Sequence, residues 1–456
     1  MVFVSECKST QRSDAAATVA CIKITIFLTI FSAIPLATCF SRSIITGHSC
    51  HDLPLTLRQK TTLQGWVQDN DGEWQWQEDD APYPSSVATS TITATATPTL
   101  PSGSFRPKQS LGQNYLRDGN TVAKIVRAFV KDATETLARR NDGGDSKLEG
   151  STQQTQRPLR AIELGPGAGA LTDVLIPTIG ITNLQCIEID GRSVELLSDK
   201  HPELTIRHQD VLQVDYPSLA KQPFNNNDAG GPLSIIGNLP YYITSQILFA
   251  LADASHTDSI RSATVTMQWE VGRRIIAPPS CKDYGILTVV FQLYADCSIH
   301  FKIPPTVFYP KPKVDSALLG LHFVGPEKLR RRLVGVRPED LRNVVTSVFQ
   351  KRRKTVRNGI RKLAMKVLGD EERVKLFLDS EPLPLPEVVK MDRDDGDAFA
   401  LGQELPRDWA SKRPEELTPG QFIEITRMLY GADEDWETCP LRNKVWRKLN
   451  HGSNSN

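Results

Sequence analysis

Four short, largely apolar runs in the middle of the chain predict the buried strands of an α/β fold. The runs are LRAIEL (159–164), NLQCIEI (183–189), LTIRHQDV (204–211) and LSIIG (233–237). Each has the length of a strand, and such near-continuous runs are typical of a parallel sheet covered on both faces. The first run leads through a glycine-rich turn into the helical pattern ALTDVLIPTI, which is the strand, turn and helix order of a nucleotide-binding unit.

In the last third of the chain the apolar residues follow helical spacing instead. The segment LRNVVTSVFQKRRKTVRNGIRKL (341–363) predicts one or two amphipathic helices, and GQFIEITRML (420–429) fits a final helix. We therefore expect a Rossmann-like α/β domain at residues 105–323 and a smaller all-α domain at residues 324–432.

The local excess of basic residues indicates a nucleic-acid-binding role for this second domain. The whole chain has a formal net charge of only +1, yet residues 329–361 carry eleven Lys or Arg against Glu339 and Asp340 alone. Such a local excess is typical of a surface that follows nucleic-acid phosphates, although a solvated helix face remains the alternative. The predicted RNA contacts are Lys351, Arg352, Arg353, Lys354 and Arg357.

The N-terminus has the pattern of a signal peptide. An apolar run covers residues 18–40 behind basic residues, is interrupted only by Lys23, and closes on small residues. A membrane anchor is the alternative, but the uncharged stretch after Lys23 is short for a bilayer and contains Pro35. We expect cleavage, and hence no stable membrane association of the mature protein.

The segment that follows has the composition of an organelle transit peptide. From Phe40 the chain is hydroxylated, basic and almost free of acidic residues. The junction ATCF resembles the bipartite presequences of algae whose plastids are reached through the secretory route, in which a Phe follows the signal cleavage site. Residues 1–61 are therefore predicted to direct the protein to a plastid, with the mitochondrion as the alternative.

Two further segments are predicted to lack a role in the fold. Residues 62–104 are rich in Trp and Asp and then in Ser, Thr, Ala and Pro, without periodicity, and predict a disordered linker; residues 433–456 form a tail. Removing everything before Phe105 is accordingly expected to leave the function intact. The eight cysteines and eight histidines are dispersed and show no ligand spacing, so neither a metal site nor a disulfide framework is predicted.

The glycine-rich turn predicts the cofactor. Glu163 precedes it, and Gly165 and Gly167 leave room for the backbone to approach a ligand. The form E-x-G-x-G-x-G, with a proline inside the turn, favours S-adenosyl-L-methionine over a dinucleotide. Glu188, at the end of the next predicted strand, is expected to accept the ribose hydroxyls. Asp210 is expected to accept from the adenine amino group, with a helix N-cap as the alternative.

The fourth predicted strand ends in the most specific motif of the chain, Asn238-Leu239-Pro240-Tyr241. An aromatic exocyclic amine is a poor nucleophile until acceptors hold its two hydrogens and draw its nitrogen toward a tetrahedral geometry. The Asn238 side-chain oxygen and the Leu239 carbonyl can be those acceptors. Pro240 stiffens the turn, and Tyr241 can stack on a flipped base.

Together these motifs resemble the KsgA-type ribosomal RNA adenine dimethyltransferases, a class I methyltransferase family, from about Phe105 to about Leu429. The matching blocks are SLGQNYL (110–116), ELGPGAG (163–169), EID (188–190), QD (209–210), NLPYYI (238–243), QWEVGRR (268–274), YGILT (284–288) and FYPKPKVDS (308–316). The family usually has Lys and Ala where this chain has Trp269 and Gly272, and the predicted loop at 141–158 is longer than in compact members.

The resemblance implies an enzyme that dimethylates the exocyclic amine of adenosines in small-subunit ribosomal RNA, with the pre-ribosomal small subunit as partner. It implies that Asn114 and Leu116 contact the methyl donor, and that Phe308 helps to hold the target base opposite Tyr241. A noncatalytic RNA- or DNA-binding descendant, such as an organellar transcription factor, is the alternative, which the intact NLPY and glycine motifs disfavour. The basic C-terminal domain disfavours a small-molecule methyltransferase. We expect a monomer.

Overall fold

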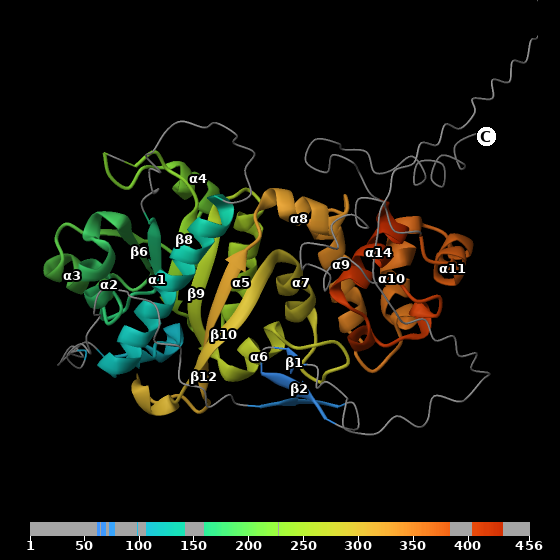
Figure 1. Ribbon diagram of the computed structural model, residues 1–456, viewed down its shortest axis with the longest axis horizontal. Coiled ribbons are helices and arrows are strands. Elements are labelled where there is room, and N and C mark those ends of the chain that lie inside the picture. The colour runs from blue at the N-terminus through green and yellow to red at the C-terminus, as the bar shows by residue number, and fades with distance from the viewer. Residues whose placement is uncertain are drawn as a thin grey trace, which may run out of the picture. The chain divides into compact units, whose positions relative to one another are not determined.

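A seven-stranded mixed sheet organises the structure (Figure 1), a computed structural model that describes residues 62–63, 65–69, 73–77, 98, 106–141, 159–226, 228–383 and 404–431. The strand order is β10-β12-β9-β8-β5-β6-β7. The strands are β5 (Ala161–Leu164), β6 (Leu184–Glu188), β7 (Thr205–His208), β8 (Leu233–Asn238), β9 (Ile260–Gln268), β10 (Ala295–Ile303) and β12 (Ser316–Phe323). β5 to β9 run parallel, β12 is added antiparallel to β9 at one edge, and β10 pairs antiparallel with β12 beyond it.

The four predicted strands are confirmed as β5, β6, β7 and β8. The third is shorter than predicted because the chain turns after His208, where Asp210 caps a short 3-10 turn at Val211–Gln213. Side chains alternate between the two faces of the sheet, as a strand requires: Ala161 and Ile162 are both fully buried but lie in different core clusters.

Helices cover both faces of the sheet, which explains why its strands are apolar throughout. The part of the chain that contains this sheet includes α1 (Gly119–Asn141), α2 (Thr172–Ile179), α3 (Gly191–Lys200), α4 (Tyr216–Lys221), α5 (Thr244–Ser255), α6 (Trp269–Ile275) and α7 (Ile286–Tyr294). On α1, the fully buried side chains recur at helical spacing and face β9 and β12; they are Val122, Ile125, Val126 and Phe129. A short pair, β4 (Tyr115–Leu116) and β11 (Phe308–Tyr309), joins the start of this part to its end.

The predicted C-terminal helices are confirmed as α9 (Pro338–Phe349), α10 (Val356–Leu368) and α14 (Pro419–Tyr430). The same region also contains α8 (Pro326–Leu333) and α11 (Glu371–Asp379), which the sequence had not predicted one by one. The amphipathic segment at 341–363 forms two helices, and its basic run falls in the turn between them (Figure 1). One core cluster includes residues of α7 as well as α9, α10 and α14, so the apolar core continues across the boundary predicted at residue 323.

The prediction of a disordered linker at 62–104 is wrong for its first part. β1 (Thr62–Leu63), β2 (Trp66–Gln68) and β3 (Trp74–Trp76) form a three-stranded antiparallel sheet. Trp66 is 3% exposed within the larger core cluster, and the Trp76 ring packs edge to face against Trp66 and Trp269, with centroids 5.6 and 5.4 Å apart. Strands of two or three residues are too short to show a period in the sequence, which is why the sheet was not predicted. Burial of its tryptophans stabilises it.

The presequence at 1–61, the tail at 433–456, most of the loop at 141–158 and nearly all of the Ser/Thr-rich part of the linker lie outside the described residues. Among the helices that the structure does describe, none combines the length and apolar character needed to span a bilayer.

Candidate active site

A cavity of about 220 Å³ lies where β5, β6 and β8 end. The chain winds from β5 toward β6 and β7 and then crosses back to β8, so β5 and β8 are the neighbours between which the winding direction reverses. In open α/β sheets ligands bind beyond the carboxyl ends of the strands at such a point. Most of the predicted site residues line the cavity; they are Asn114, Gly165, Gly167, Glu188, Asp210, Asn238, Leu239, Pro240 and Tyr241.

The glycine turn shapes one wall. Gly165 and Gly167 have φ values of +65° and +55°, a left-handed conformation that side chains disfavour. A Cβ at Gly167 would lie only 2.7 Å from the Tyr115 ring, whereas the space beside Gly165 is open. The turn thus combines a close packing contact with a gap in which a ligand can approach the backbone.

Two carboxylates at the ends of β6 and β7 face the same cavity. Glu188 is 4% exposed; its Oε2 accepts from the Gly167 N–H at 2.9 Å, and its Oε1 accepts from the N–H groups of Ile189 and Asp190. Burial raises the pKa of Glu188 above its usual value. Asp210 lines the cavity and also accepts from the Leu212 N–H at 2.9 Å, so the alternative capping role is observed, and its contact with the adenine amino group stays a prediction.

These residues fit the adenosine part of the predicted cofactor. Glu188 provides carboxylate oxygens for ribose hydroxyls, and Asp210 lies further along the same wall. Ile189 is an apolar side chain of the cavity lining that is left 48% exposed, a surface that an adenine ring would cover. Both the polar and the apolar parts of the wall are therefore suited to S-adenosyl-L-methionine.

Hydrogen bonds to neighbouring elements orient the Asn238 side chain. Its Nδ2 donates to the Asn114 carbonyl at 2.7 Å, and its Oδ1 accepts from the hydroxyl of Thr266 on β9. Tyr241 shares a 2.6 Å hydrogen bond between its hydroxyl and that of Ser316 on β12. Burial raises the pKa of the Tyr241 phenol, which keeps the proton in place for this contact. Both polar side chains of the NLPY motif are thus held by hydroxyl groups of other strands, Asn238 from β9 and Tyr241 from β12.

Two predicted residues do not line the cavity. Leu116 and Phe308 are 3% and 1% exposed and pair with each other across β4 and β11. Both belong to the core cluster that includes the buried side chains of α1. The aromatic side chain beside Phe308 that is exposed is Tyr309, at 46%. Contacts of Leu116 with the cofactor and of Phe308 with the target base stay predictions, and the observed role of both side chains is packing.

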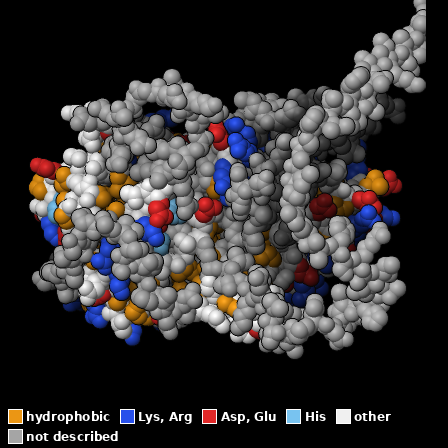
Figure 2. All heavy atoms as spheres, viewed as in Figure 1, with side chains coloured by type: hydrophobic (Ala, Val, Ile, Leu, Met, Phe, Trp, Pro, Cys, Tyr) orange, Lys and Arg blue, Asp and Glu red, His pale blue; other side chains and the backbone are white. Residues whose placement is uncertain are grey.

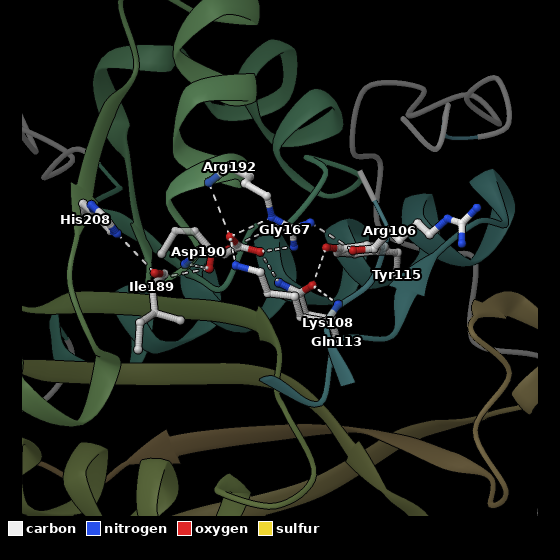
Figure 3. Close-up of polar contacts among 10 residues, drawn as sticks. Arg106, Lys108, Gln113, Tyr115, Gly167, Ile189, Asp190, Arg192 and His208 are labelled. Atoms are coloured by element: carbon white, nitrogen blue, oxygen red, sulfur yellow. Dashed lines mark hydrogen bonds and ion pairs between the residues drawn. The ribbon is translucent and has the colours of Figure 1, made fainter. Parts of the chain in front are cut away.

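A buried carboxylate fixes the segment that forms another wall (Figure 3). Asp190, 2% exposed, accepts from Lys108 Nζ and Gln113 Nε2 at 3.0 Å each and from Arg192 Nη2 at 2.7 Å. The Arg192 hydrogen bonds are the main cause that lowers the Asp190 pKa, so this carboxylate is ionised at neutral pH. Gln113 in turn accepts from the Tyr115 hydroxyl at 2.7 Å. Asp190 thereby ties the chain that contains Asn114 to the N-terminus of α3.

The five basic residues predicted to bind RNA have different surroundings. Lys351, Arg353 and Lys354 are exposed in the turn between α9 and α10. Arg352 donates to the carbonyls of Lys282 and Tyr284, and Arg357 to the Leu378 carbonyl and the Asp379 carboxylate. On the face shown in Figure 2, Lys and Arg side chains occur in separate groups with acidic side chains beside them, in keeping with the small net charge.

Several residues that shape the site were not found from the sequence. They are Lys108, Gln113, Tyr115, Asp190, Thr266 and Ser316. Gln113, Tyr115, Asp190 and Ser316 lie inside recognisable motif blocks, but the blocks do not say which side chain meets which. Within the described parts of the chain, no group of three or more His, Cys, Asp or Glu side chains is arranged to hold a metal ion.

The chain is similar in sequence to proteins of one family. The family model described as "Ribosomal RNA adenine dimethylase" matches residues 104–376. "Ribosomal RNA small subunit methyltransferase A" of Salinibacter ruber is 35% identical over 330 residues, 71% of this chain and 86% of that protein. The protein of the same name from Chlorobaculum tepidum is 35% identical over 280 residues, 61% of this chain and 86% of its own length.

Similar solved structures include a dimethyladenosine transferase from Plasmodium falciparum, with a TM-score of 0.42 and 19% identity over 59% of this chain and 90% of that one. The 23S rRNA methyltransferase ErmE gives a TM-score of 0.37 and 21% identity, covering 69% of this chain and 99% of that one.

Proposed function

Because the chain belongs to the ribosomal RNA adenine dimethylase family, we propose that Asn238 and Leu239 hold the target amine of an adenosine in small-subunit ribosomal RNA for two successive methylations. The activity of the family, S-adenosylmethionine-dependent dimethylation of adenosine in ribosomal RNA, is the activity of this chain, and the predicted resemblance is confirmed. The small subunit as substrate follows the name of the relatives. The observation that supports the catalytic assignment is the fixed orientation of Asn238 at the cavity edge of β8.

The proposed mechanism depends on positioning rather than on a strong base. The Asn238 amide oxygen and the Leu239 carbonyl accept the two amine hydrogens, which localises the nitrogen lone pair as the nitrogen becomes tetrahedral. When bound, S-adenosyl-L-methionine supplies the electrophilic methyl group. The methylated nitrogen is an acidic ammonium that loses its proton readily, so no side chain has to act as a strong base beside it.

Tyr241 is proposed to hold the flipped adenine. Its ring lines the cavity beside Asn238, and the Ser316 contact fixes the ring through the hydroxyl. A base taken out of its stack needs an aromatic or apolar surface to replace its lost neighbours. Tyr242, the next residue, lines the same cavity with 60% of its surface exposed and extends the aromatic surface toward its mouth.

A noncatalytic nucleic-acid-binding descendant would have no need for this arrangement. In such a protein the hydrogen bonds of Asn238 could be lost, and residues with side chains could replace the glycines of the turn, without loss of function. Instead, the amine-binding motif and a cavity that fits the cofactor occur together. Detecting methyl transfer to small-subunit particles that lack dimethyladenosine separates the two functions, because a noncatalytic descendant gives none.

We propose that the exposed basic turn, Lys351, Arg353 and Lys354, binds RNA phosphates. Replacing the three residues with Gln is expected to weaken RNA binding and to flatten its salt dependence, because each lost phosphate contact removes about one counterion's worth of slope. The maximal rate at saturating RNA should stay near that of the wild type, since the turn holds the ribosomal substrate rather than the flipped base. A salt titration of binding measures both effects.

A matched control removes the same charge elsewhere. Lys362 and Lys366 on α10 and Lys375 on α11 are also exposed, and their replacement with Gln should leave the slope nearly unchanged. Arg352 and Arg357 are poor choices for this test because their hydrogen bonds support the fold. Equal slopes for the wild type and the turn variant would show that the turn is only a solvated surface.

We propose that the protein acts in a plastid, with the mitochondrion as the alternative. We also propose that it acts as a monomer. The support is the signal-like run at 18–40 followed by the basic, hydroxylated segment that begins at Phe40. A reporter fused to residues 1–61 should reach the plastid, and Phe40→Ala should leave it outside the organelle. Mitochondrial fluorescence would reassign the protein. Mapping dimethyladenosine in plastid and mitochondrial small-subunit rRNA from cells that lack this protein identifies the substrate.

A further inference from the structure

Thr266 contacts both residues that are proposed to hold the target amine. Its hydroxyl donates to Asn238 Oδ1, and its backbone carbonyl accepts from the Leu239 N–H at 3.2 Å. We propose that Thr266 is a positioning residue for methyl transfer, which fixes the directions of the two acceptors without touching the substrate. This inference rests on the proposed function of Asn238 and Leu239.

The direction of each hydrogen bond follows from the groups involved. The Asn114 carbonyl can only accept, so the Asn238 amide must present its nitrogen to it, at 2.7 Å. The amide oxygen then faces Thr266, and the Thr266 hydroxyl must donate. The Asn114 carbonyl thus excludes the flipped amide, which would present an N–H donor to an amine that itself needs acceptors.

The contact also leaves the oxygen able to bind the substrate. An amide oxygen has two lone pairs, of which Thr266 occupies one, so the other remains for an amine hydrogen. On the backbone side, the Thr266 carbonyl anchors Leu239, whose own carbonyl is the second acceptor. One residue on β9 therefore restrains both acceptors, in keeping with the parallel register that places Asn238 beside Thr266.

Thr266 is suited to this role by its rigidity. It is fully buried in β9, where water cannot replace its hydroxyl, and its β-branched side chain has few χ1 states available in a strand. A positioned hydrogen bond contributes to catalysis because it needs no rearrangement as the reaction proceeds. A flexible donor at this point would hold Asn238 less firmly.

A purely structural role is the alternative, and β9 contains a residue that shows what that role looks like. Thr264 is two positions earlier, also fully buried, and donates its hydroxyl to the Asp132 carboxylate at 2.6 Å. Asp132 in turn contacts His300 and His322, away from the NLPY motif. Thr264 and Thr266 thus form a matched pair that differs in the partner of the hydroxyl.

The test compares isosteric variants at the two positions. Thr266→Val removes the hydroxyl but retains the shape and the backbone carbonyl, and it is expected to lower kcat about tenfold with the KM for S-adenosylmethionine changed less than about twofold. Thr266→Ser, which restores the hydroxyl, should recover kcat to within about threefold of wild type. Thr264→Val should keep a wild-type kcat, even if its thermal stability falls. If Thr266→Val does not fold, Thr266→Ala provides the second variant without the hydroxyl.

A double-mutant cycle distinguishes action through Asn238 from a general effect. Combined with Asn238→Ala, Thr266→Val should cause little further loss of kcat, because the group that it orients is gone. A wild-type kcat for Thr266→Val, or full additivity with Asn238→Ala, would overturn the inference while leaving the proposed function in place. Wild-type turnover in Asn238→Ala alone would instead overturn the proposed function itself.

Discussion

Asn238→Ala is expected to lower the rate of methyl transfer by about two to three orders of magnitude, as the loss of a transition-state hydrogen bond should. The amide oxygen gains most from the amine hydrogen as the nitrogen becomes tetrahedral, so its removal affects the chemical step more than ground-state binding. Single-turnover methylation of small-subunit particles measures this step directly. Calorimetry should show cofactor binding largely retained, because Glu188 and the glycine turn are untouched.

The contrasting variant is Glu188→Ala. Its ribose contact is made equally in the ground and transition states, so affinity for the cofactor should fall more than the rate at saturation. The two variants together distinguish a catalytic acceptor from a binding residue in the same cavity. Near-normal turnover of Asn238→Ala, with Glu188→Ala behaving as expected, would leave the cavity a cofactor site but would remove Asn238 from the mechanism.

The parts of this site that were predictable share one property, which is that short stretches of chain encode them. Gly165 and Gly167 follow β5 directly, Glu188 ends β6, and Asn238 ends β8. Because parallel strands end at one edge of a sheet, the order of strand and motif along the chain is enough to bring these residues together. The fold class could be predicted for the same reason.

The parts that were not predictable depend on contacts between distant segments. Thr266 meets Asn238 only through the register of β8 and β9, and Ser316 meets Tyr241 only because β12 adds to the sheet antiparallel. For Arg357, the sequence shows the charge but not its partner, Asp379, which lies at the end of α11. Residue type alone therefore does not separate an RNA-binding arginine from one that supports the fold.

The N-terminal sheet explains a departure from the family pattern. Trp269 occupies a position where the family usually has Lys, and the structure shows its ring packed against Trp76. Lys302 on β10 lies 5.3 Å from the centroid of the Trp269 ring, and Arg273 on α6, the helix that begins at Trp269, lies 5.2 Å from the centroid of the Trp66 ring. α6 thus carries an aromatic and cationic surface that the sheet at 62–76 covers.

Two truncations are therefore expected to differ, contrary to the interpretation of 62–104 as a dispensable linker. A chain that begins at Gln59 retains all three strands and should unfold like the full chain. A chain that begins at Arg106 loses Trp66 from the core and uncovers Trp269, and its free energy of unfolding should fall by at least about 3 kcal/mol, as for the loss of one buried aromatic side chain. Because α6 begins at Trp269, directly after Gln268 ends the strand that carries Thr266, methylation by this shorter chain should also be lost at a lower temperature than methylation by the longer chain.

Point variants in the chain that begins at Gln59 identify the cause. Trp66→Ala should reproduce most of the stability loss because its side chain is 3% exposed, whereas Gln77→Ala, an exposed residue that follows β3, should have little effect. Urea unfolding of the four proteins gives the comparison, with the slope of each transition reporting the surface exposed on unfolding. Equal stability for the two truncated chains would show that the sheet at 62–76 contributes nothing to the fold, and α6 would then have to be stable with Trp269 uncovered.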